Sequence, residues 1–448
     1  MPFRRVWVWL ALIGFWTGAP LARAQDVASE KSSVQANLET AKLVEELRAH
    51  EARIKELEEK LAQLMASKSE EKAKESTPPP AAPAAEANAE AIPVPVTQPA
   101  PEPPAEHEHT VRMPGGGPEL KIRGFADFNL GFGSAANSLI FPLPTPVHNT
   151  FQAGEFDLFL SSRLSKKVSF VSEIIYGSDP TNEWGLDIER FQLTYKASPY
   201  FQISGGRFHT SIGYYNTAFH HGTWFQTATG RPFMYYFEDS GGLLPVHGVG
   251  ISATGLVPGT GRLELHWIAE ASNGRASDRN LSPVQNFLSD RNRKAVNVAA
   301  YIKPQWLSGL QVGGSYYHDR LVPPGITHVN QDISSLYAVF NNGSWEILGE
   351  GVLLSNEADG TGKRFNSPLT YAQISRKFGQ YRPYFRYQYL NVPNNDPVNV
   401  FTGRYDGPSF GLRMDFTEYA ALKAQYNRIY LRDATALNGV DLQVAFTF

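Results

Sequence analysis

Apolar and polar residues alternate with a period of two along most of the chain after residue 118. Such a period predicts β-strands that separate an apolar environment from a polar one. The clearest case is the end of the chain, where one face of 438–448 collects Val440, Leu442, Val444, Phe446 and Phe448. The pattern predicts sixteen strands in all, at 119–133, 152–164, 168–177, 186–196, 200–207, 246–257, 262–271, 294–303, 309–318, 332–341, 344–354, 367–378, 381–391, 405–416, 419–430 and 438–448.

The connections between these strands alternate in length. Every second connection is a turn of 2 to 5 residues, and the others are longer, at 134–151, 178–185, 208–245, 272–293, 319–331, 355–366, 392–404 and 431–437. Transmembrane barrels have this asymmetry, with short periplasmic turns and long outer loops. Closed barrels and helices are the structures that cross lipid without unpaired backbone groups. We therefore expect an all-β transmembrane barrel of about 16 antiparallel strands over 119–448.

Aromatic residues concentrate near the ends of the predicted strands, as at Tyr195, Trp267, Tyr301 and Trp345. Girdles of aromatic side chains mark the two interfaces of a membrane barrel. The general preference of aromatic residues for strands is the alternative explanation. Combined with the alternation of the loops, the pattern favours a girdle.

Residues 1–24 have the organisation of a secretory signal peptide. Arg4 and Arg5 precede an apolar run over 6–16, and Ala22 and Ala24 provide the small residues of a cleavage site. A short buried helix is the alternative, and the run is too short to span a bilayer. Export of a chain without Cys and without a membrane helix fits a Gram-negative periplasmic or outer-membrane protein. Together with the predicted barrel, it leads us to expect the outer membrane, with the N-terminal region in the periplasm.

Two further segments precede the predicted barrel. Over 30–75, Thr40, Leu47, Ile54 and Leu61 lie seven residues apart, and charged residues fill the other positions. This pattern favours a self-associating periplasmic coiled coil over a lone amphipathic helix, and it does not decide between a dimer and a trimer. Residues 76–118 are rich in Pro and Ala and cannot bury a core, so we expect a disordered linker there.

Composition narrows the function classes. The chain has no Cys, which excludes disulfide scaffolds, Cys-based zinc sites and Cys nucleophiles, and its net charge of −3 argues against a nucleic-acid partner. It has no G-x-S-x-G, H-E-x-x-H or Gly-rich phosphate loop, so we expect no catalytic residues, no metal and no cofactor. His209, His220 and His221 share a loop with Ser211 and Asp239. A barrel hydrolase or a zinc site built on these residues is a less favoured alternative.

The signal peptide, the sixteen strands, the eight long loops and the terminal strand VDLQVAFTF together resemble the sixteen-stranded bacterial outer-membrane porins. The heptads, the Pro-rich linker and the opening KIRGFADFNLGFG are similar to the porin O/P group of phosphate-selective porins and their relatives. This resemblance implies a water-filled channel for passive diffusion of small polar or anionic solutes. It also implies a homotrimer and a third long loop that folds into the barrel and narrows it.

The longest loop, 208–245, is the candidate constriction. It is crowded with aromatic residues and Gly and poor in charge, whereas an outward-facing loop would be more polar. Its charged residues are Arg231, Glu238 and Asp239. Phosphate-selective porins use rows of Arg and Lys in the constriction, so a loop with Arg231 alone argues against phosphate selectivity.

Charged residues on the polar face of the strands are candidates for the channel lining. The set comprises Lys121, Arg123, Arg382, Arg386, Arg413, Lys423, Glu264, Glu270, Glu346 and Glu350. The basic and acidic members lie on different strands, and opposed charged walls would orient polar solutes in a transverse field. The alternative is that these charges pair and only hold the interior together. Arg207 has lipid-facing parity and is excluded unless Gly205 and Gly206 form a β-bulge.

A structural role remains as a further alternative. The coiled coil and the linker would tether the envelope through peptidoglycan or a periplasmic partner, with the barrel as the anchor in outer-membrane lipid. This role is compatible with a channel, because it uses a different part of the chain.

Overall fold

The computed structural model describes residues 109–112, 117–133, 149–178, 184–219, 222–238, 242–277, 288–323, 325–399, 402–433 and 436–448. The predicted signal peptide, the predicted coiled coil and the predicted linker up to residue 108 lie outside the described residues.

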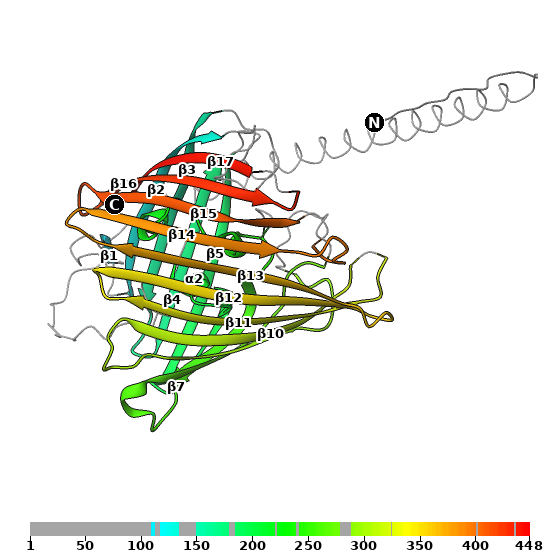
Figure 1. Ribbon diagram of the computed structural model, residues 1–448. Coiled ribbons are helices and arrows are strands. Elements are labelled where there is room, and N and C mark those ends of the chain that lie inside the picture. The colour runs from blue at the N-terminus through cyan, green and yellow to red at the C-terminus, as the bar shows by residue number, and fades with distance from the viewer. Residues whose placement is uncertain are drawn as a thin grey trace, which may run out of the picture. The chain divides into compact units, whose positions relative to one another are not determined.

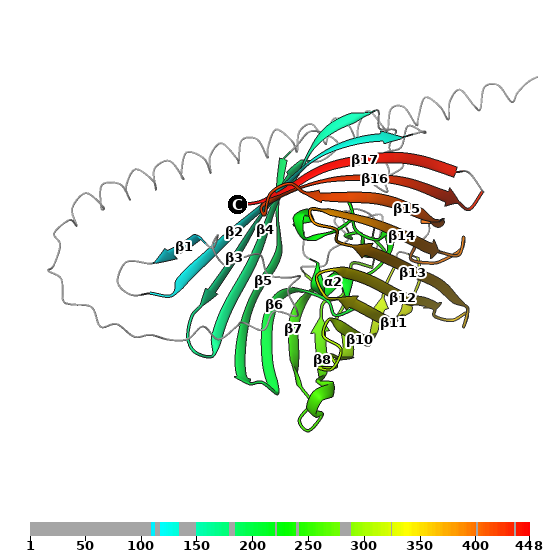
Figure 2. The same cartoon turned by 60° about the vertical axis from the view of Figure 1, so that its left-hand side comes forward.

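Within the described part of the chain, sixteen antiparallel strands form a closed barrel (Figures 1 and 2). Strands adjacent in sequence pair with one another, and the barrel closes where β17 pairs with β2, with Val444 opposite Phe128. The predicted fold class of the barrel region is confirmed. The strands are β2 Glu119–Gly133, β3 Thr150–Arg163, β4 Val168–Ser178, β5 Trp184–Ser198, β6 Phe201–His209, β7 His247–Leu256, β8 Leu265–Ser272, β9 Ala295–Ile302, β10 Leu310–Leu321, β11 Val329–Asn341, β12 Trp345–Ala358, β13 Arg364–Arg376, β14 Tyr381–Asn391, β15 Arg404–Asp415, β16 Ala420–Leu431 and β17 Ala436–Thr447.

A short additional strand, β1 His109–Arg112, lies in the range that we expected to be linker. It pairs antiparallel with the beginning of β2, where Arg112 lies opposite Glu119. Sheet structure therefore begins before the first predicted strand.

Burial alternates along the strands as the sequence pattern predicts. In β13, Phe365 and Leu369 are buried, and the residues between the inward-facing positions are exposed. The outer face carries large apolar side chains, with Phe151, Leu186 and Leu336 exposed at 68 %, 65 % and 75 %. An apolar outer surface of this kind is unfavourable in water and favourable against lipid hydrocarbon.

The longest connection, residues 210–246, is named L3 below. It contains the helix α2 Tyr215–Ala218 and the 3-10 turns η2 Thr223–Phe225 and η3 Phe233–Tyr235. Figure 2 shows α2 on the inner side of the strand wall. Among the described residues, no helix has the length and apolar character needed to cross a membrane.

A bulge in β5 adds a charged residue to the interior. The pairing of β4 with β5 shifts by one residue after Glu173, which pairs with Arg190, because Glu189 is the additional residue. Glu189 and Arg190 are both buried, at 3 % and 6 % exposure. Strict alternation would have placed only one of them inside, so the sequence pattern missed Glu189.

A second irregularity occurs at Gly206 in β6, where φ is +132°. Arg207 and His209, which follow it, are both buried, and the Arg207 side chain reaches Glu189. The exclusion of Arg207 from the interior is therefore wrong. The irregular backbone at Gly206 has the effect that a β-bulge would have had, because it turns the Arg207 side chain to the interior.

We expect Gly206→Ala to destabilise the barrel by about 2 kcal/mol, from strain at positive φ and from overpacking. A Cβ at residue 206 would lie 1.9 Å from the carbonyl oxygen of Phe191. Gly205→Ala is the matched control, because a Cβ there meets nothing within 4 Å. Urea unfolding in lipid vesicles measures the difference, and equal stability of the two variants would contradict this account of β6.

Candidate functional site

L3 is packed inside the barrel. Ala228 and Tyr235 are 0 % exposed, and the ring of Phe225 lies 4.8 Å from the ring of Phe125 on the inner face of β2. Apolar burial on this scale holds the loop against the wall in addition to any polar contact. The prediction that the longest loop folds into the barrel is confirmed.

One wall of the barrel binds L3 through its carbonyl groups. Arg386 of β14 donates from Nη1 to the carbonyl oxygen of Gly230 at 2.7 Å. Arg413 of β15 and Lys423 of β16 each donate to two carbonyl oxygens within 223–228. Because Lys423 is 0 % exposed, these bonds replace the water that its ammonium group loses on burial.

Acidic residues of other strands bind L3 through its N–H groups. Glu350 of β12 accepts from the backbone N–H groups of Tyr214 and Tyr215, at 2.6 and 2.9 Å. It also accepts from a tyrosine hydroxyl of L3 and from one of β13. Glu270 of β8 accepts from the backbone N–H and the hydroxyl of Ser211, at 3.0 and 2.8 Å.

Both sets of contacts join a charged side chain to the oppositely charged end of a peptide dipole. Cationic side chains hold the negative ends of peptide groups, and carboxylates hold the positive ends. The basic residues lie on β14, β15 and β16 and the acidic residues on β8 and β12, and both groups bind peptide groups of L3. For these residues, the contacts agree with the alternative that the charges hold the interior together.

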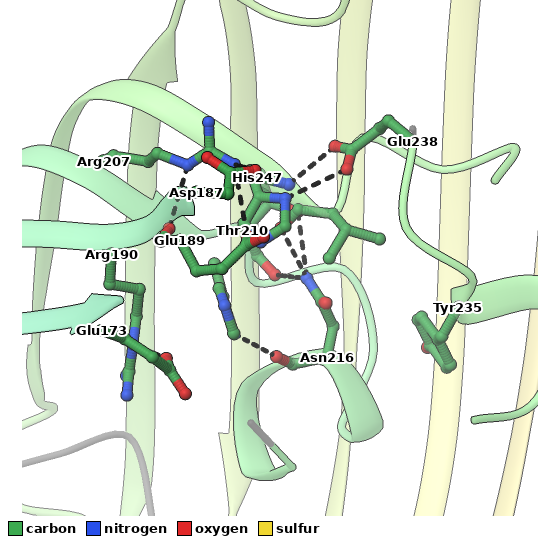
Figure 3. A network of polar contacts seen from close by, with 12 residues as sticks. Glu173, Asp187, Glu189, Arg190, Arg207, Thr210, Asn216, Tyr235, Glu238 and His247 are labelled. Atoms are coloured by element: carbon green, nitrogen blue, oxygen red, sulfur yellow. Dashed lines mark hydrogen bonds and ion pairs between the residues drawn. The ribbon is translucent and has the colours of Figure 1, made fainter. Parts of the chain in front are cut away.

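A buried ionic network fixes the far end of L3 to β5, β6 and β7 (Figure 3). His247 at the start of β7 lies between two carboxylates, with Nε2 2.6 Å from Glu189 and Nδ1 3.0 Å from Glu238 of L3. The His247 backbone N–H also donates to Glu238 at 2.8 Å. On the other side of this network, Nη2 of Arg207 in β6 lies 3.2 Å from Oε2 of Glu189. Glu238 therefore connects L3 to the barrel wall.

The contacts of Glu238 change its acidity. Burial alone would raise the pKa of Glu238, but attraction to the His247 imidazole and hydrogen bonds from its ring and backbone lower it by more. The net pKa of Glu238 is below its ordinary value, so the contact favours the carboxylate.

Arg231, the predicted cation of the constriction, is an internal brace of L3. It is buried, its Nε donates to the carbonyl oxygen of Tyr235 at 2.8 Å, and its guanidinium lies 4.2 Å from the centre of the Phe237 ring. Burial lowers the pKa of Arg231. The sequence alone did not show that the partners of Arg231 belong to its own loop.

The remaining predicted lining residues lie at different depths. Glu346 is buried and accepts a hydrogen bond from Gln373 of β13 at 2.7 Å. Arg382 donates to the carbonyl oxygen of Gly343 at 2.8 Å, beside a short turn. Glu264 has φ of 49° in the turn before β8. Lys121 and Arg123 are partly exposed and share the inward parity of the buried residues of β2.

The residues considered for catalysis do not form a catalytic group where they are described. The Ser211 hydroxyl donates to a carboxylate of β8, and His209 Nδ1 contacts a backbone carbonyl of α2. His220, His221 and Asp239 lie outside the described residues. Across the parts of the chain that the structure describes, no group of three or more His, Asp or Glu residues is arranged to hold a metal ion.

A pocket remains between the start of L3 and the wall formed by β8 to β11. Its lining includes Tyr214 and Thr217 of L3 and Tyr301, Gln311 and Tyr337 of the wall. The expectation that Tyr301 belongs to an interfacial girdle is therefore wrong. Its parity within β9 could have shown this, because the alternate residues of that strand are the exposed ones.

Comparison with known proteins places the fold. No protein-family model and no curated protein sequence matches the chain. Among solved structures, an anion-selective porin from Comamonas acidovorans matches with a TM-score of 0.52 at 12 % identity, over 73 % of this chain and 99 % of that one. The outer membrane channel DcaP of Acinetobacter baumannii matches with a TM-score of 0.52 at 10 % identity, over 75 % and 99 %. Salmonella typhi OmpF, in complex with daunomycin, matches with a TM-score of 0.54 at 12 % identity, over 76 % and 100 %.

The fold is the porin fold. These solved structures are bacterial outer-membrane porins or channels, and the match extends over nearly their whole length. At 10 to 12 % identity the likeness concerns the porin fold itself, and the contacts of L3 are properties of this chain.

The Glu238 contact predicts an acid-dependent loss of stability of this porin-fold barrel. Because the folded-state pKa is lowered, the contact stabilises fully above the unfolded glutamate pKa of about 4.3 and is lost as pH falls through the folded value. We expect wild type to lose more thermal stability than Glu238→Gln between pH 6 and 3. Circular dichroism melts of both proteins measure this difference, and parallel pH profiles would contradict the assigned contact.

Proposed function

We propose that this chain is an outer-membrane porin through which small polar or anionic solutes diffuse passively along a water-filled channel. The observation that carries the proposal is a closed sixteen-stranded barrel with an apolar outer face and a long loop fixed inside. Barrels of this strand number enclose an aqueous lumen unless something fills it. L3 fills part of it and so narrows the passage.

The location follows from the same features. The exposed apolar side chains of the wall require lipid, and the leader at residues 1–24 directs the chain out of the cytoplasm. We place the barrel in the outer membrane and the residues before it in the periplasm. Lys121, Arg123 and Arg382 lie toward the short-turn end of the barrel, together with the acidic residues Glu264 and Glu346.

The finer assignments rest on the N-terminal sequence. The heptads over 30–75 and the Pro-rich linker support membership of the porin O/P group and self-association, for which we propose a homotrimer. They also support a second role, in which this region tethers the envelope to peptidoglycan or a periplasmic partner. Deletion of residues 30–108 separates the roles, because it should weaken assembly or attachment and spare conduction.

Planar bilayer recording tests the channel. We expect purified protein to raise bilayer conductance in discrete steps, and the absence of steps would contradict the proposal. Glu350→Gln should give larger and noisier steps, because it weakens two backbone contacts of L3, and hydrogen bonds to charged groups are worth roughly 1.5–3 kcal/mol each. Glu346→Gln is the matched control on the inner face of the same strand, since its hydrogen bonds go to β13.

A further inference from the structure

The short-turn end of the barrel carries a basic surface on β2, β3 and β5. In the short-turn halves of β2 to β6, at 117–126, 158–172 and 191–206, Glu119 is the one acidic side chain. The same segments contain six basic residues, named the basic rim below: Lys121, Arg123, Arg163, Lys166, Lys167 and Lys196. Acidic residues of the short-turn end such as Glu264 and Glu346 belong to other parts of the wall, before β8 and on β12.

Four residues of the basic rim face the mouth of the barrel: Lys121, Arg123, Arg163 and Lys196. Each of them lies an even number of residues from a buried inward residue of its own strand, and these inward residues are Phe125 in β2, Asp157 in β3 and Arg190 in β5. Adjacent strands lie about 4.8 Å apart, so the four residues extend over roughly 15 Å of the mouth, from β2 to β5. They do not lie on the lipid side of the wall.

The strand β1 brings the N-terminal region of the chain to this rim (Figure 2). Its first residue, His109, lies opposite Ile122 of β2, and one further residue in the same register would lie opposite Arg123. From Gly124 onward this edge of β2 is occupied by the end of β17, because Gly124 and Phe448 exchange backbone hydrogen bonds of 2.8 and 2.9 Å. The chain before residue 109 therefore has no further edge of β2 to pair with.

The segment before β1 is acidic. Residues 76–108 contain five Glu and no Lys, Arg or Asp, and Glu102, Glu106 and Glu108 lie within seven residues of β1. A path along the outer face of the barrel would bring these carboxylates beside exposed apolar side chains and lipid, where ionised groups are costly. A path across the mouth brings them to the basic rim. Charge complementarity favours the path across the mouth.

We propose that residues 102–108 dock on the basic rim, with their carboxylates against its inward-facing cations. At about 3.1 Å per residue these seven residues reach about 22 Å, which is enough to cross from β2 to β5. Exposed ion pairs are weak, but a short connection to β1 holds the segment at an effective concentration on the order of millimolar. Anionic lipid headgroups are the competing occupant for Lys166 and Lys167 in the β3–β4 turn, and they do not reach the inward cations.

Zero-length carbodiimide cross-linking tests this contact, because it joins a carboxylate to an amine that touches it. The full-length protein is reconstituted in phosphatidylcholine vesicles, whose lipids carry neither reactive group. We expect amide cross-links from residues 102–108 to Lys121 or Lys196, identified by mass spectrometry. Their yield should fall roughly threefold or more between about 0.1 M and about 1 M NaCl, because the Debye length shortens from about 10 Å to about 3 Å.

Lys121→Arg combined with Lys196→Arg keeps the charge of the basic rim and removes both amines, so these cross-links should disappear. Lys303→Arg is the matched control, because Lys303 follows β9 at the short-turn end and lies outside the basic rim. It should leave the cross-links to Lys121 and Lys196 unchanged.

Four results would overturn the docking. These are an absence of cross-links from 102–108 to Lys121 and Lys196, cross-links to Lys303 in equal yield, cross-links confined to Lys166 and Lys167, and a yield that does not respond to salt. A mixture of unlabelled and nitrogen-15-labelled protein shows which chain supplies each residue, and cross-links found only between two chains would overturn docking within one chain. Cross-linking is measured without current, so its failure leaves the porin function standing.

Discussion

The structure depends on the attachment of L3 peptide groups to two oppositely charged parts of the barrel wall. Arg386, Arg413 and Lys423 hold carbonyl oxygens of the loop, and Glu270 and Glu350 hold its N–H groups. A loop inside a barrel cannot pair its backbone with a strand ladder, so its polar groups need partners of another kind. Charged side chains meet this need, and the loop in turn replaces the water that these charges lose.

This mutual dependence determines what the lumen offers to a solute. Wall charges that bind L3 are no longer available to line the open passage, and the residual pocket next to β9 and β10 has an uncharged lining among the described residues. For these wall residues, a charge on the inner face binds L3 and is not evidence of contact with a solute. Counting basic and acidic residues on the inner face overstates how strongly the channel discriminates by charge.

The sequence was sufficient to predict much of the fold. The period of two gave the inner face of β2, β13 and β17, and the alternation of loop lengths identified a closed barrel. It failed where the backbone departs from a regular strand. The bulge at Glu189 and the positive φ at Gly206 bring Glu189 and Arg207 together inside, although strict parity puts Arg207 outside.

The candidate site was predictable as a set of residues and not as a set of contacts. Residues such as Glu350 and Arg413 were placed inward by parity, but their partners lie in L3, more than a hundred residues away. Periodicity carries no information on the path of an irregular loop, so it could not show which charges L3 would use. Arg231 illustrates the same limit, because its partners lie within L3 itself.

Hydrogen exchange of the L3 amides in lipid, followed by mass spectrometry, tests the central claim most directly. Amides that donate to buried carboxylates exchange only when that contact opens. The account predicts that peptides covering 211–219 and 223–238 exchange as slowly as the neighbouring strands. Exchange of these peptides at the rate of an unstructured chain, with the strands still protected, would show that the charged walls do not hold L3.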